Sequence, residues 1–144
     1  MQNKDLVYKV VSLLAMVAIL AIAWGMDVFL AYQSNLASAS FNYVQFFALS
    51  AASALLLIAL WFGLGWLTLF KCGYSRLIWI TFLVVGLFWA LFPYVAPLLT
   101  WLPNRAEIIN TLWSRSAMVR ATGMFIAVVG LLNLALRSRS RLGG

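Results

Sequence analysis

Four apolar stretches, each about twenty residues or slightly longer, fill most of this chain and constrain its fold more than any other feature. They cover approximately residues 10–30, 46–70, 77–102 and 117–136. A helix of about 20 apolar residues crosses the roughly 30 Å hydrocarbon core of a bilayer. The pattern predicts an all-α integral membrane protein with four transmembrane helices arranged as two helical hairpins.

The composition leads to the same class of protein. Of the 144 residues, 65% are hydrophobic and 9% are charged, and the mean hydropathy is +1.00. A soluble domain is about a quarter charged, because polar side chains must cover its core. No connection between the stretches exceeds about fifteen residues, which is too short for a separate soluble domain. We therefore expect residues 1–144 to form a single transmembrane domain.

The cations indicate how the four spans are oriented. Most of them fall on one side of a four-span topology, and basic connections face the cytoplasm. The pattern predicts that both termini are cytoplasmic, in a membrane such as the bacterial inner membrane. The residues on this side are Lys4, Lys9, Lys71, Arg76, Arg137, Arg139 and Arg141.

Two features of the connections allow a second interpretation. Ala37-Ser38-Ala39 resembles a signal-peptide cleavage site, but the apolar run before it is longer than a signal peptide requires, so we favour a retained first span. Residues 104–115 carry apolar side chains at helical spacing, with polar ones elsewhere. They fit either a short helix lying in the membrane interface or an extended start of the fourth span.

Several classes of chemistry are excluded by the residues that the chain lacks. It has no histidine, one cysteine, Cys72, and three carboxylates, Asp5, Asp27 and Glu107. Imidazole metal sites, bis-histidine haem and paired-cysteine centres are therefore ruled out. We expect no catalytic, metal-binding or cofactor-binding residues.

The net charge of +7 does not indicate nucleic-acid binding, because the cations mark membrane topology rather than a folded basic face. Basic residues beside a membrane attract anionic lipid headgroups. We assign that role to Arg137, Arg139 and Arg141, at the end of the fourth span.

Asp27 and Arg120 are the most informative residues, because a charge inside a span is costly and needs a partner. Asp27 follows Lys9 by 18 residues, and Arg120 precedes Arg137 by 17, so both lie about 25–27 Å from the cytoplasmic flank. They are a candidate intramembrane polar pair. Three interpretations are open: a structural pair, two independent interfacial charges, or a transport or binding site.

Further residues at similar depth define two candidate surfaces. The small residues Gly123, Ala127 and Gly130 share a helical stripe with Arg120, which predicts a close helix-packing face. Proline frees a backbone carbonyl one turn earlier in a helix. An outward-facing polar pocket around the pair is therefore possible, with a lining formed by Ser50, Ser53, Trp89 and Pro93.

No motif in the sequence is specific to one family. The lack of catalytic groups and of soluble domains favours a non-enzymatic accessory, assembly or scaffold subunit of a larger membrane protein complex. Its expected partners are the lipid bilayer and other membrane subunits or further copies of itself, with no nucleic acid. The alternative is a small oligomeric transporter or channel that uses Asp27 and Arg120, and a holin-like or immunity protein is a weaker third.

Overall fold

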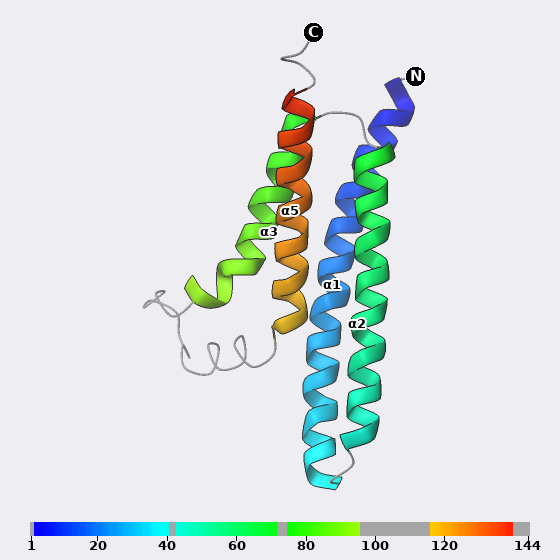
Figure 1. Ribbon diagram of the computed structural model, residues 1–144, viewed down its shortest axis with the longest axis vertical. Coiled ribbons are helices and arrows are strands. Elements are labelled where there is room, and N and C mark those ends of the chain that lie inside the picture. Colours follow the sequence, from blue (N-terminus) through cyan, green and yellow to red (C-terminus); the bar gives the residue numbers. More distant parts are fainter. Residues whose placement is uncertain (1, 41–42, 72–74, 96–115, 140–144) are drawn as a thin grey trace.

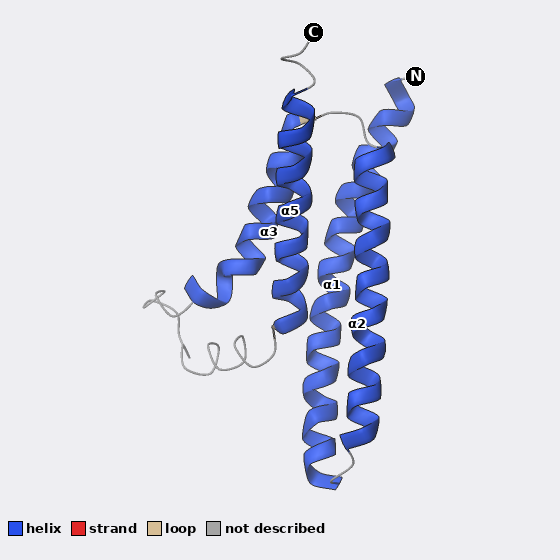
Figure 2. Cartoon of the chain, in the orientation of Figure 1, coloured by secondary structure: helices blue, strands red, loops and turns tan. Residues whose placement is uncertain are grey.

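The computed structural model describes residues 2–40, 43–71, 75–95 and 116–139, and all of its regular structure there is helical (Figure 2). Two α-helices, α1 (Gln2–Ser40) and α2 (Tyr43–Trp66), form the first hairpin. A π-helical segment, η1 (Leu67–Lys71), continues α2. The second pair consists of α3 (Arg76–Val95) and α5 (Ala117–Arg139). The predicted all-α class is confirmed.

Three helical stretches are long and apolar enough to cross a membrane: Lys4–Ser40, Tyr43–Lys71 and Ala117–Leu136. The apolar stretch Arg76–Phe92 of α3 is shorter. The first helix extends ten residues beyond the predicted span end at Leu30, because residues 31–40 contain no proline or glycine to stop it. The Ala37-Ser38-Ala39 sequence therefore lies inside α1. The proposed helix over 104–115 lies outside the described residues.

The helices pack as two antiparallel pairs that meet along α1 and α5 (Figure 1). The closest pairing is between α3 and α5, where glycines let the two backbones touch. A Cβ atom built on Gly123 would lie 2.7 Å from the Ala90 nitrogen and 2.8 Å from the Gly86 oxygen. One on Gly130 would lie 2.8 Å from the Leu83 nitrogen. Small residues therefore set the distance between these helices.

A hydrophobic core fills the junction between the pairs. Its fully buried members include Leu57 of α2, Ile126 of α5, and Trp79 and Phe82 of α3. The rings of Trp79 and Phe82 meet edge to face, with centroids 5.5 Å apart. Ala23 of α1 belongs to the same cluster, so side chains from all four α-helices hold the bundle together.

The first hairpin is much longer than the second pair. Its α1 helix has 39 residues and a length of about 58 Å, whereas α5 has 23 residues and a length of about 35 Å. In Figure 1 the end of α1 and the start of α2 lie well beyond the start of α5. We name this extension, residues 28–40 and 43–54, the distal hairpin. It contains no charged residue.

Candidate functional site

The side chain of Asp27, on α1, contacts the start of α5 and thereby joins the two helix pairs. One carboxylate oxygen accepts a hydrogen bond from the Met118 N–H at 3.0 Å, and the other accepts one from the Val119 N–H at 2.9 Å. Asp27 is 6% exposed. Both oxygens of the buried carboxylate therefore accept hydrogen bonds from backbone N–H groups of α5, which lie 91 and 92 residues further along the sequence.

This contact is a helix cap supplied by another helix. The first four N–H groups of an α-helix have no partner within the helix, and the helix dipole makes that end positive. Ser116 precedes α5 and is the natural capping residue in sequence, but its buried hydroxyl makes no hydrogen bond among the described residues. The Asp27 carboxylate takes that role and supplies the negative charge that this helix end favours.

Arg120 lies one turn into α5 and connects it to the end of α3. Its Nη1 donates to the Tyr94 hydroxyl at 3.3 Å, and its Nε donates to the Ser116 carbonyl at 3.4 Å. The guanidinium carbon also lies 5.8 Å from the centre of the Tyr94 ring. Arg120 attracts Asp27 across space. Elsewhere on α1, Lys9 and Asp5 form a side-chain ion pair.

A second polar contact joins α2 to α5 one turn further along. The Trp61 indole N–H donates to the Thr122 hydroxyl at 3.3 Å, and that hydroxyl donates to the Met118 carbonyl at 2.8 Å. The Trp61 ring stacks on Phe125 with centroids 5.2 Å apart. The first turns of α5 are thus held by α1 through Asp27 and by α2 through Trp61.

The residues predicted to line a polar pocket are spread over two helices. Ser50 and Ser53 are half-buried on α2, in the distal hairpin. Trp89 lies on α3, and its ring meets Trp24 of α1 with centroids 6.1 Å apart. Pro93 lies in the last turn of α3, and its side chain is outside the described residues.

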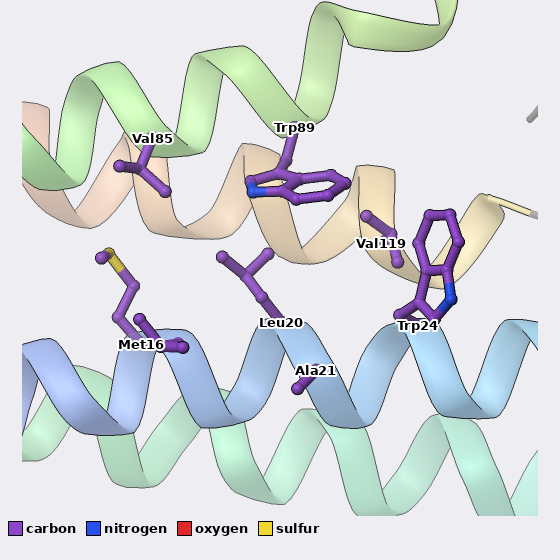
Figure 3. A pocket seen from close by; sticks show the side chains of 8 residues that line it. Met16, Leu20, Ala21, Trp24, Val85, Trp89 and Val119 are labelled. Carbon is purple, nitrogen blue, oxygen red and sulfur yellow. The ribbon is translucent and has the colours of Figure 1, made fainter.

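A cavity opens beside Trp89, but its lining is apolar. We call it the tryptophan groove; it has a volume of about 410 Å³ and runs between α1 and α3 over α5 (Figure 3). It is lined by Met16, Val17, Leu20, Ala21, Trp24, Val85, Trp89 and Val119. Among these described lining residues there is no charged side chain, so this groove suits hydrocarbon rather than an ion.

The other predicted residues lie as follows. Gly123, Ala127 and Gly130 face α3 along the close contact described above. Arg137 and Arg139 lie in the last turn of α5, and Arg141 lies outside the described residues. In the described part of the chain no group of three metal-ligating side chains is present.

The sequence reasoning placed Asp27 and Arg120 at one level but did not identify the helix start as the carboxylate's partner. The available signal was the start of the fourth span at residue 117, only three residues before Arg120. A helix N-terminus at the depth of a buried carboxylate supplies unpaired amides. Comparison with protein-family models, with curated proteins and with solved structures found no match.

Proposed function

We propose that this protein is a non-enzymatic accessory or assembly subunit that binds a larger membrane protein through its distal hairpin. In this proposal all four α-helices span a bacterial inner membrane. Both termini lie in the cytoplasm, as the positions of the basic residues favour, and the distal hairpin lies on the opposite side.

The observation that carries the proposal is the length of the first hairpin. Helix α5 has 23 residues, or about 35 Å, which is enough to cross the hydrocarbon core. From Asp27, which contacts the start of α5, helix α1 continues for 13 further residues to Ser40, or about 20 Å. That extension reaches beyond the hydrocarbon defined by α5.

The surface of the distal hairpin is suited to a protein partner. Large apolar side chains are exposed on both of its helices, and they include Tyr32 at 61%, Val44 at 81% and Phe47 at 65%. Exposed asparagine, serine and glutamine residues lie among them. An apolar surface with polar neighbours, outside lipid, is the usual composition of a protein interface.

The bonding of Asp27 supports a scaffold rather than a transporter. A coupling carboxylate in a transporter must exchange its partners with ions or protons along a water-filled path. Both Asp27 oxygens accept hydrogen bonds from first-turn amides of α5 that have no partner within that helix. Displacing them exposes two unpaired N–H groups, which is costly in a membrane.

The proposal is tested by photo-crosslinking in cells. A photoreactive residue replaces Val44 in the distal hairpin, and a matched variant carries it at Leu14, which is 65% exposed in the first half of α1. We expect the Val44 probe to give a discrete crosslink to a second membrane protein and the Leu14 probe to give none. Crosslinks only between copies of this chain, or a lone monomer after gentle-detergent purification, would overturn the accessory role.

A further inference from the structure

A second apolar groove lies between the first hairpin and α5, and its position beside the basic end of the bundle suggests a ligand. It has a volume of about 460 Å³, within the usual range of ligand pockets. Trp61, Gly65, Leu69 and Phe70 line it on one side, and Phe125 and Leu132 of α5 line it on the other. We call it the α2–α5 groove.

The groove is open because α2 packs on α1 and touches α5 over only a short distance. The stacked rings of Trp61 and Phe125 both line it. Beyond that stack Gly65 contributes no side chain, and an added Cβ atom would lie 3.8 Å from the Phe125 ring. The space between the helices is therefore left to an apolar occupant.

The groove ends beside a basic residue of η1. Phe70 lines the groove and is followed at once by Lys71, which is exposed at the end of η1. On α5, Arg137 and Arg139 follow Leu132 by five and seven residues, or about 8 and 10 Å. Asp5, the one acidic residue described at this end, is paired with Lys9. Lys71 therefore places a positive charge at this end of the groove.

From this arrangement we propose that the α2–α5 groove holds one acyl chain of an anionic phospholipid, with the lipid phosphate beside Lys71. The apolar walls fit the hydrocarbon chain, and the Lys71 ammonium at the mouth complements the headgroup. A zwitterionic lipid offers the same chain, but its headgroup has no net negative charge. The groove alone binds the acyl chains of both lipids equally well. The positive charge at the mouth therefore favours the anionic lipid over the zwitterionic one.

The π-helical geometry of η1 contributes to this site. An α-helix that changes to π-helical hydrogen bonding places later residues on a different face than continued α-helical geometry would, and such turns are frequent at functional sites. The Thr68 hydroxyl donates to the Gly65 carbonyl at 3.0 Å and is fully buried. Thr68 thus occupies the bundle side of η1, while Leu69, Phe70 and Lys71 remain exposed.

The experiment is native mass spectrometry of the purified full chain in detergent, titrated with phosphatidylglycerol or with phosphatidylcholine of identical acyl chains. We expect one phosphatidylglycerol to bind in preference to phosphatidylcholine. Lys71→Gln should lower that preference about fivefold, the effect expected for one basic residue near a lipid headgroup. Gly65→Leu, which places a side chain in the groove, should reduce binding of both lipids.

The matched control is Ala21→Leu, which fills the tryptophan groove instead and should leave binding of both lipids unchanged. Thermal unfolding establishes which variants are folded, and Lys71→Gln tests the headgroup contact without altering the groove. Equal binding of the two lipids by the unaltered chain, or an undiminished preference in Lys71→Gln, would overturn the proposal. Loss of phosphatidylglycerol in Ala21→Leu rather than in Gly65→Leu would do the same, because it would assign the lipid to the other groove.

Discussion

Replacing Asp27 with asparagine tests the cap that holds α5 against α1. Asparagine keeps one acceptor oxygen, but it places an NH₂ group against the second α5 amide and removes the negative charge. Losing one charge-assisted hydrogen bond of the two seen at 2.9 and 3.0 Å should cost about 1.5–3 kcal/mol of unfolding free energy. Asp27→Ala removes both bonds and should cost about twice as much.

The assay is reversible unfolding in mixed micelles with increasing dodecyl sulfate, followed by tryptophan fluorescence. Asp5→Asn is the matched control, because it removes the same charge from the same helix at a partly exposed ion pair with Lys9; such pairs contribute about 0–1 kcal/mol. Amide hydrogen exchange should accelerate in Asp27→Asn chiefly at Met118 and Val119. If Asp27→Asn is as stable as Asp5→Asn and these two amides exchange as before, the carboxylate is not the cap.

Three further substitutions probe the contacts around α5, each measured by the same unfolding assay. Gly123→Leu should prevent the close approach of α3 and destabilise the bundle, because an added Cβ atom already lies 2.7 Å from the Ala90 nitrogen; Gly25→Leu, with open space around it, should be tolerated. Ile126→Ala should cost about 2–5 kcal/mol, since Ile126 is fully buried in the core, and a cost below 1 kcal/mol would mean that the core is not packed there. Trp61→Phe should cost about 0.5–1.5 kcal/mol by removing the hydrogen bond to Thr122 at 3.3 Å, whereas an unchanged stability would show that the stacking on Phe125 suffices.

The helical class of this protein could be predicted from its sequence, and the ends of its helices only in part. Hydropathy identifies the apolar runs, but it does not report where a helix stops when the residues that follow are uncharged and include neither proline nor glycine. Residues 31–40 are such a segment, and α1 continues through them to Ser40. The length of the distal hairpin could therefore not be predicted, because the sequence of residues 31–40 is typical of a connection between spans.

The candidate site shows a different limit. Counting residues gives the depth of Asp27 and of Arg120, because rise per residue is fixed in a helix. It does not identify the partner of Asp27, because that partner is a pair of backbone N–H groups, which are present at every residue except proline and leave no signal in the sequence. Similarly, the spacing of Gly123, Ala127 and Gly130 indicates a face for close packing, but the identity of the neighbour as α3 depends on the three-dimensional arrangement.

The Asp27 contact also sets how far α5 can slide along α1. A shift of α5 by a single residue moves its amides by about 1.5 Å, which is enough to break both hydrogen bonds, now 2.9 and 3.0 Å long. During synthesis α1 emerges some 90 residues before these amides, so the carboxylate is already present when α5 arrives. It therefore acts as a stop that fixes the position of α5 along α1, and with it the height at which α3 and α5 stand beside the first hairpin.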